Sequence, residues 1–376
     1  MRTDGGKKWQ RVGRGVDSVL AEGTLVAAAL TVAIVAALLL ATGYAPLDVY
    51  ATMLTGSLTG AGLVSTLQQA VPVIGLALAL CFSFRAGVFN LGGEGQFVIG
   101  GCAGTIAALT LPGPGLVVIV ASLAVAALAA TAWAAIPPLL QEHLDAPIFV
   151  TSLLLNYPAI ALTSYAVKTW LKDPASSLMA TRRVGETRRI GPLADPESGP
   201  GLAIAALFGP DGAVTLITSG LSWSLLVVAA VLAFTIFVNT RLPIGLEAQV
   251  LGLNPRLARH TGVDVARVVR VHMLIGGAIA GVVGTLVVLS SHYRFIDGAL
   301  DGTGYAVTAL LVVLLGRSRP WGVVAAGFFF SALIVGGQAM EREYGLSSYL
   351  SIIIQALVIF LVTLRLTRAW RRRWTS

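Results

Sequence analysis

Residues 84–96, with the sequence FRAGVFNLGGEGQ, bring together side chains that could bind a polar solute. The segment holds one acid (Glu94), two amides (Asn90 and Gln96) and four glycines, and it lies between two long apolar runs. Glycine lets the backbone turn sharply or approach another chain closely. Polar groups at membrane depth are costly unless they face a cavity or the protein interior. We therefore predict a helix break or a tight helix entry beside a translocation path, with these three polar residues as path or gate candidates.

The same polar residues have a structural alternative. They could cap the following helix and form hydrogen bonds with the backbone groups that the glycine break exposes. The sequence favours neither function strongly enough to exclude the other.

The motifs of common enzymes are absent from the sequence. The four lysines, at positions 7, 8, 168 and 172, follow no glycine-rich loop, so there is no phosphate-binding G-x-x-x-x-G-K-[ST] motif. The four histidines lack metal-ligand spacing, and neither an H-E-x-x-H nor a G-x-S-x-G motif occurs. We therefore expect no catalytic residue, no metal, no bound cofactor and no ATPase site on this chain.

Composition defines the class of protein. Of the 376 residues, 56% are hydrophobic and only 12% are charged, whereas soluble domains carry about 25% charged residues. Several apolar runs exceed the roughly 18 residues that mark a membrane-spanning helix. We predict an all-α, polytopic membrane protein, and we attribute its net charge of +8 to membrane topology and not to nucleic-acid binding.

The apolar runs predict about ten transmembrane helices. They lie at 24–43, 66–84, 93–111, 116–136, 148–167, 219–238, 271–290, 303–316, 321–338 and 347–364. If the chain begins in the cytoplasm, 18 of its 26 Lys and Arg residues fall on the cytoplasmic side. This bias predicts that both termini are cytoplasmic. The alternative, that 24–43 is a cleaved signal peptide, is disfavoured because this run exceeds the ~7–15 residues of a signal core.

These spans divide the chain into three parts. We expect residues 1–23 to form a basic cytoplasmic segment, 24–366 a transmembrane domain, and 367–376 a basic cytoplasmic tail. The domain contains two long loops, 168–218 outside and 239–270 in the cytoplasm. A loop of that length with helical segments of its own is usually functional.

Ionisable residues are nearly absent from the predicted spans, and Glu94 is the one candidate. A carrier driven by protons or sodium usually needs an intramembrane carboxylate for its coupling ion. The sequence therefore favours a pore whose energy source lies on another chain over a secondary carrier.

Three motifs resemble one family. Residues 89–96, FNLGGEGQ, resemble the F-N-[IL]-G-x-E-G-Q signature of nucleoside-type ABC importer permeases, a branch of the branched-chain amino acid and ribose permease superfamily. Residues 252–263 resemble the cytoplasmic coupling loop G-x-N-P-x-A-A-x-x-x-G-[IV], with Leu257 where the family often has Ala. Residues 302–322 resemble a late G-x-G-[FY]…A-L-L-G-x-x-x-P-x-G block. The resemblance covers roughly residues 60–365.

The resemblance implies a function and a set of partners. It implies a multi-pass cell-membrane permease of the importer fold that moves nucleosides inward by alternating access. Its expected partners are a cytosolic ABC ATPase that binds ATP-Mg, a second and shorter permease, and a substrate-binding protein outside. Alternatives are a permease for a simple sugar or a branched-chain amino acid.

The coupling loop and one further amide complete the candidate residues. A short helix at 256–266 would present arginines to a groove of the ATPase, with Glu247 capping or pairing with them. Asn156, beside Tyr157, could bind the edge and face of a nucleobase, or equally could join two helices. The expected coupling residues are Glu247, Gly252, Asn254, Arg256, Arg259 and Gly262.

Overall fold

The computed structural model describes residues 43–195 and 220–345, with parts of 29–41 and isolated positions within 202–218 and at 353. The predicted segments 1–23 and 367–376 lie outside the described residues, as do part of the span 24–43 and all but one residue of the span 347–364. Ten spans and two cytoplasmic termini therefore stay predictions. Regular structure within the described part is helical, with isolated β-bridges only.

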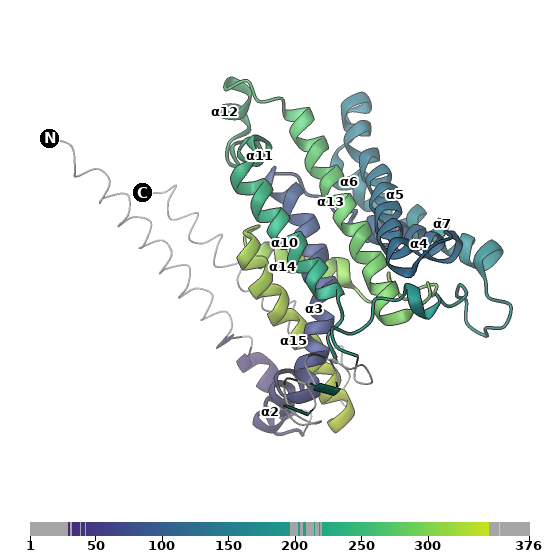
Figure 1. Cartoon of the computed structure of the whole chain (residues 1–376). Helices are drawn as coiled ribbons and strands as arrows, with labels where there is room; N and C mark the ends of the chain where they lie inside the picture. The colour runs from purple at the N-terminus through teal and green to yellow at the C-terminus, as the bar shows by residue number, and fades with distance from the viewer. Residues whose placement is uncertain are drawn as a thin grey trace. The chain divides into compact units, whose positions relative to one another are not determined.

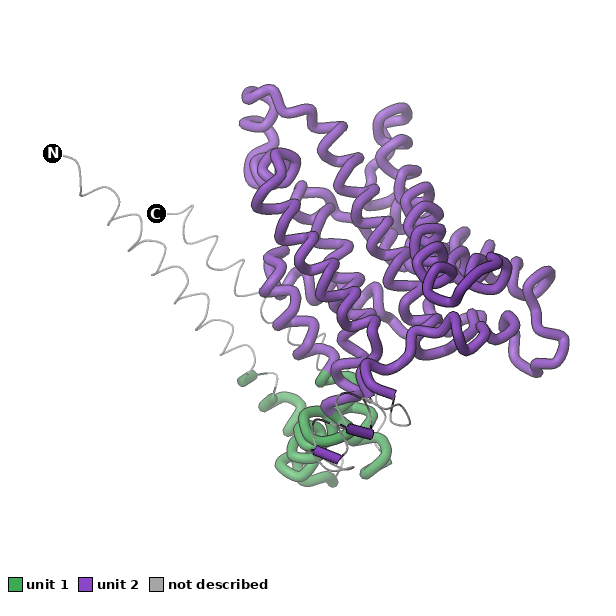
Figure 2. Tube along the Cα trace, viewed as in Figure 1, with its two compact units in different colours: residues 1–62, 332–376 green, residues 63–331 purple. Residues whose placement is uncertain are grey.

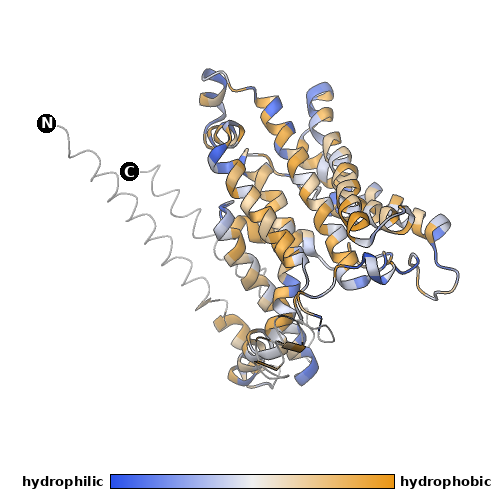
Figure 3. Cartoon of the chain, in the orientation of Figure 1, coloured by the Kyte–Doolittle hydropathy of each residue, from blue (hydrophilic) through white to orange (hydrophobic). Residues whose placement is uncertain are grey.

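Six of the described helices are long and apolar enough to cross a membrane, which confirms the polytopic all-α class (Figures 1 and 3). A seventh crossing is added if Val32–Ala41 and α2 (Pro46–Leu58), which meet at 120°, count as one span. The six are α3 (Gly60–Arg85), α5 (Gly115–Leu144), α6–α7–η1 (Ile148–Leu171), α10 (Ser224–Arg241), α13–η3 (Val265–His292) and α15 (Pro320–Tyr344).

Two predicted spans differ from the structure. The run 303–316 becomes α14 (Tyr305–Leu315), which has only 11 residues. At 1.5 Å per residue it extends about 16 Å, roughly half of the ~30 Å apolar core of a bilayer. The run 93–111 becomes α4 (Gly93–Thr110), an 18-residue helix whose first turn is polar and which is not among the six apolar helices. Complete crossings at these two places are not confirmed.

The chain divides into two compact units (Figure 2). The first unit contains residues 1–62 and 332–376, so both ends of the chain belong to it. Its core packs side chains from α2 and its preceding helix against the end of α15. The buried core residues are Val35, Leu39, Val49, Met53 and Met340.

Within the second unit, residues 63–331, α13 packs against both α4 and α5. Small residues make this approach possible: a Cβ added to Gly281 would overlap the carbonyl oxygen of Ala126 on α5, and one added to Gly100 would overlap Gly281 itself. Thr285 then donates a hydrogen bond to the carbonyl of Gly100 at 3.0 Å. The spacing of small residues along α13 is thus explained by helix packing.

The two ends of α13 carry different structures. At its N-terminal end lie two short helices, α11 (Pro243–Leu253) and α12 (Pro255–His260) (Figure 1). Beyond its C-terminal end, the segment 179–190 is joined to 289–297 by backbone hydrogen bonds, such as Thr181 N to Phe295 O at 2.9 Å. Segments 239–264 and 168–195 are therefore at opposite ends of the second unit.

We predict that Gly281→Ala destabilises the protein by about 1–3 kcal/mol, because its methyl group would overlap the backbone of α5. Thermal unfolding in detergent measures this effect. Gly185→Ala is the matched control, since Gly185 has an ordinary φ of −58° and no atom within 4 Å of an added Cβ. Equal stability of the two variants would contradict the packing argument.

Candidate translocation path and coupling segment

The segment 86–92 enters α4 beside a break between α6 (Ile148–Leu154) and α7 (Asn156–Ala166). Pro158 lacks the N–H that would continue the helical hydrogen bonding across this break. Asn156 accepts a hydrogen bond from the Gly95 N–H and donates one to the Leu91 carbonyl, both at 2.9 Å. Ser152 Oγ accepts from the Leu91 N–H at 3.1 Å. The buried amide of Asn156 thus joins the α6–α7 break to the start of α4.

The other two predicted amides also have partners within the protein. Asn90 Oδ1 accepts from the Gly92 N–H at 2.9 Å, and its Nδ2 donates to Gln96 Oε1 at 3.4 Å. Asn90 and Gln96 are 1% and 2% exposed. For these two residues and Asn156, the contacts match the structural alternative of capping and helix joining. Contact of any of them with a substrate stays a prediction.

Glu94 differs from these amides because it is half-buried and bonds to no residue in the described part of the chain. Asp301 lies close enough for the two negative charges to repel each other. One turn beyond Glu94, the Phe97 ring meets the edge of Tyr305 at 6.1 Å, and Tyr305 bonds to Gln69 of α3. Two carboxylates, an amide and a phenol, from three helices and the loop before α14, therefore gather where α4 and α14 begin.

Sequence reasoning missed Asp301 as a member of this group. Tyr305 was within a recognised motif, but nothing in the motif connected it with Glu94. The physical signal is the shortness of α14, because a helix of 11 residues is too short to cross the apolar core of a bilayer, so its preceding loop and Asp301 can lie beside other helices.

The predicted coupling residues lie on α11, α12 and the turns around them. Asn254 caps α12, with its side-chain oxygen accepting from the N–H groups of Arg256 and Leu257, both at 3.1 Å. Gly262 has φ +80°, a left-handed conformation that ends the segment. Arg256 and Arg259 are exposed. The sequence requirement for Asn and Gly here is therefore local backbone geometry.

The prediction that Glu247 pairs with the arginines of this loop differs from the structure. Glu247 is on α11 and pairs with neither Arg256 nor Arg259 in the described residues. Arg270 of α13 forms a two-pronged ion pair with Glu142 of α5, at 2.6 to 3.0 Å. This pair joins α5 to α13 next to the coupling segment.

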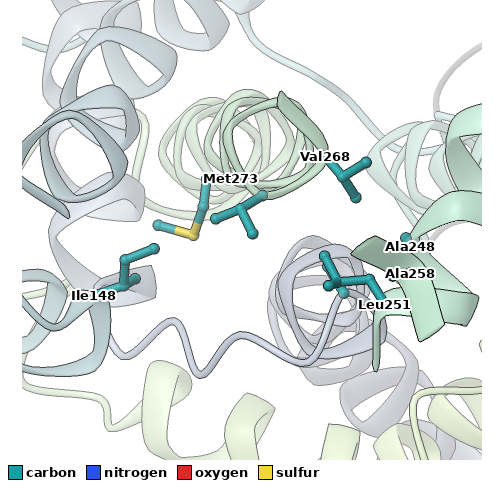
Figure 4. Packing of buried hydrophobic residues seen from close by; sticks show 8 residues of the cluster. Ile148, Ala248, Leu251, Ala258, Val268 and Met273 are labelled. Carbon is teal, nitrogen blue, oxygen red and sulfur yellow. The ribbon is translucent and has the colours of Figure 1, made fainter. Parts of the chain in front are cut away.

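A buried apolar cluster lies beneath α11 and α12 (Figure 4). It joins the coupling segment to α13, to α6 and to the residue that follows α3. Its members are Ala86, Ile148, Ala248, Leu251, Ala258, Val268, Val269 and Met273.

A second ion pair, between a lysine and an aspartate, lies beyond the C-terminal end of α13. Lys168 Nζ is 2.9 Å from Asp297 Oδ2, and Ser164 donates a hydrogen bond to Asp297 Oδ1. Burial raises the pKa of Asp297, but the bonds from Ser164 and Lys168 outweigh it, so the net pKa lies below its usual value. Asp297 is therefore held ionised.

The family model described as "Branched-chain amino acid transport system / permease component" matches residues 62–363. The chain belongs to this permease family. The resemblance seen in the three motifs is confirmed, and with its apolar helices the permease is a multi-pass protein of the cell membrane.

Known permeases align over most of this permease. It is 34% identical over 363 residues to the glucose ABC transporter permease protein TsgB13 of Haloferax volcanii, covering 95% of this chain and 91% of that protein. It is 28% identical over 342 residues to the guanosine ABC transporter permease protein NupP of Bacillus subtilis, covering 90% and 91%. A second guanosine permease of that organism, NupQ, is 26% identical over 270 residues, covering 71% and 78%.

We predict that Asn156→Asp destabilises the permease by about 1–3 kcal/mol. The second carboxylate oxygen would face the Leu91 carbonyl, which then has no donor and is repelled. Thermal unfolding in detergent tests this, with Tyr157→Phe as the control at the neighbouring, 69% exposed position. An Asn156→Asp variant as stable as wild type would contradict the stabilising function of the two Asn156 hydrogen bonds.

The Asp297 pair predicts a pH dependence. Because the folded pKa is lowered, the stabilisation is present above the unfolded value of about 4 and is lost as pH falls through the folded value. Lys168 is half exposed, so we expect Asp297→Asn to cost only about 0.5–1 kcal/mol at pH 7. Chemical unfolding of wild type and Asp297→Asn, measured from pH 7 to pH 3, should show that the difference in their free energies of unfolding shrinks as the pH falls. A difference that stays constant with pH would contradict the stabilising ion pair.

Proposed function

We propose that this permease is the membrane-spanning subunit of an ATP-driven ABC importer, and that it moves a nucleoside inward by alternating access. The observation that carries the proposal is the family match over 62–363. The match includes both the segment 86–92, which Ser152 and Asn156 hold at the start of α4, and α12, which Asn254 caps. A separate ATPase would bind ATP-Mg and supply the energy, so no cofactor is assigned to this chain.

The coupling segment is the proposed ATPase contact. A capped short helix with exposed Arg256 and Arg259 has the form of a helix that docks into a groove of a partner. The buried cluster under it would pass a displacement of α12 to α13 and α6. In this proposal Gly252, Asn254 and Gly262 fix the shape of the segment, and Glu247 remains a candidate on its inner side.

The proposed assembly contains a second, different permease and an external substrate-binding protein. Its support is that this chain aligns with two guanosine permeases of one organism, NupP over 90% and NupQ over 71% of its length. A pair of unequal permeases is the arrangement that the motif resemblance implies.

The proposed path runs past Glu94. Asn90, Gln96 and Asn156 stabilise the segment that lines it. Asp301 and Tyr305 join Glu94 as groups that could accept hydrogen bonds from sugar hydroxyls or stack on a ring. A nucleoside and a simple sugar share this neutral, hydroxyl-rich ring. An amino acid would bring both an ammonium group, which Glu94 and Asp301 attract, and a carboxylate, which they repel, so these two acids do not select against the substrate named in the family description.

A simple sugar is the second candidate substrate. One observation favours it: identity to the glucose permease is 34%, against 28% to the guanosine permease. The motif at 89–96 favours a nucleoside.

The test is purification of the complex from native membranes, followed by reconstitution with the binding protein. ATP hydrolysis and uptake of labelled guanosine and glucose are then measured. Recovery of an ATPase with guanosine-stimulated hydrolysis would support the proposal, and stimulation by glucose alone would move it to the sugar. Absence of any ATPase would overturn the importer function, and a secondary carrier would then be the alternative to test.

We predict that Glu94→Gln lowers substrate uptake about tenfold, because it removes a charged acceptor next to the proposed path. Membrane expression should be unchanged, since Glu94 has no ion-pair partner in the described residues. Glu341→Gln, at an exposed position of α15, is the matched control. Uptake at the wild-type rate by Glu94→Gln would contradict the assignment of Glu94 to the translocation path.

A further inference from the structure

Arg85, the last residue of α3, contacts the coupling segment directly. Its Nη2 donates a hydrogen bond to Gln249 Oε1 of α11 at 2.8 Å. A basic residue at the end of a helix is favoured by the helix dipole, and it also fits the topology bias. Neither effect requires a specific partner on another element, so the bond to Gln249 needs its own explanation.

The backbones of α3 and α11 meet at the same place. A Cβ added to Gly252 would overlap the carbonyl oxygen of Arg85. Gly87 has φ +75°, and a Cβ there would lie 3.1 Å from the Gly252 Cα. Between the two glycines, Ala86 is buried in the apolar cluster with Ala248 and Leu251 of α11. The end of α3 and the end of α11 are therefore packed without intervening side chains.

The segment that begins at this joint leads to the proposed path. Six residues after Arg85, Leu91 is held by Ser152 and Asn156 at the α6–α7 break, and Glu94 follows in the first turn of α4. A displacement of α11 thus reaches the helix break and α4 through one short stretch of chain that is fixed at both ends.

Arg85 also has an unused donor. Among the described residues, its Nε is buried without a partner, and so is Nε2 of His272, a fully buried residue of α13. His272 Nδ1 is 2.8 Å from the Val268 carbonyl, which can only accept, so Nδ1 carries the hydrogen and Nε2 is an acceptor. The ring of Phe82, one turn before Arg85 on α3, lies 6.0 Å from the His272 ring, and the charge of Arg85 acts on the same ring. A buried donor on α3 and a buried acceptor on α13 are therefore close and complementary.

Unpaired buried polar groups are unfavourable, so a conformation that joins these two atoms gains a hydrogen bond that the present one lacks. In the present conformation, Gln249 holds the guanidinium through Nη2. Movement of α11 would weaken that bond and leave Arg85 free to turn toward α13.

We propose that Arg85 is the positioning residue that couples the ATPase-contacting segment to the translocation path. It holds α11 through Gln249 in one state, and it pairs with His272 of α13 when α11 moves. This inference rests on the proposed function, since it presumes that an ATPase moves α11 and α12.

The test uses the complete complex in proteoliposomes, and it measures substrate taken up per ATP hydrolysed. Arg85→Ala should lower this ratio about tenfold, within the usual range of coupling between sites, while hydrolysis continues. Gln249→Ala should lower it as well, and the double variant should lose no more than Arg85→Ala alone. Arg319→Ala, which removes an exposed arginine in the turn before α15, is the matched control and should couple like wild type.

Further variants guard against a simple folding defect. Arg85→Lys keeps the charge but loses the planar fork, so it should assemble normally and still show a lowered ratio. His272→Leu keeps an apolar volume but removes the acceptor, and it should lower uptake while hydrolysis persists. Thermal unfolding and recovery of the ATPase are measured for every variant.

Different results overturn different claims. A wild-type ratio in Arg85→Ala and Arg85→Lys overturns the coupling function of Arg85. Independent, multiplicative losses in the double variant overturn the Arg85–Gln249 link, and an unchanged His272→Leu overturns the switch to α13. A wild-type complex that hydrolyses ATP without any uptake, or lacks an ATPase, overturns the proposed function and the coupling inference with it.

Discussion

Backbone groups inside a membrane must find hydrogen-bond partners within the protein, because hydrocarbon offers none. The break between α6 and α7 and the irregular segment before α4 create several such groups at neighbouring positions. Asn156 pairs one N–H and one carbonyl of that segment, and Ser152 pairs another N–H. The position of α4, and with it the orientation of Glu94, depends on this small set of bonds.

Close helix packing has a related cause. In lipid, apolar side chains gain little by leaving their surroundings, so helices associate through contact at short range. Glycines on α4 and α13 allow that contact, and Thr285 adds a hydrogen bond to the buried Gly100 carbonyl. The tightly packed α4, α5 and α13 form a frame, whereas the break and the short α14 provide the irregular positions where polar groups gather.

The proposed coupling segment joins this frame at two kinds of contact. Apolar packing beneath α11 and α12 transmits displacement without specifying direction (Figure 4). The hydrogen bond from Arg85 to Gln249 adds that specificity, and in our proposal His272 is the acceptor that replaces Gln249 when α11 moves. A transporter that links hydrolysis on one chain to opening on another needs both, because packing alone does not distinguish two states.

The sequence by itself determined the properties that depend on local chemistry. Apolar runs predicted the membrane helices because hydrophobic length is set by bilayer thickness. Asn254 and Gly262 were identifiable because a cap and a left-handed turn each need a particular residue at one position. The motif at 89–96 identified the family for the same reason, since its glycines and amides serve a fixed backbone path.

Only the tertiary structure decided which polar groups meet. Asn156 bonds to backbone 61 and 65 residues away, and Arg270 pairs with Glu142 across 128 residues. No local pattern encodes such pairings, because each depends on the packing of whole helices. The proximity of Asp301 to Glu94 likewise arises where the start of α14 packs against other elements, and that of Arg85 to Gln249 arises where the ends of α3 and α11 meet. A sequence shows which groups can bond, and the fold decides which of them are close enough to do so.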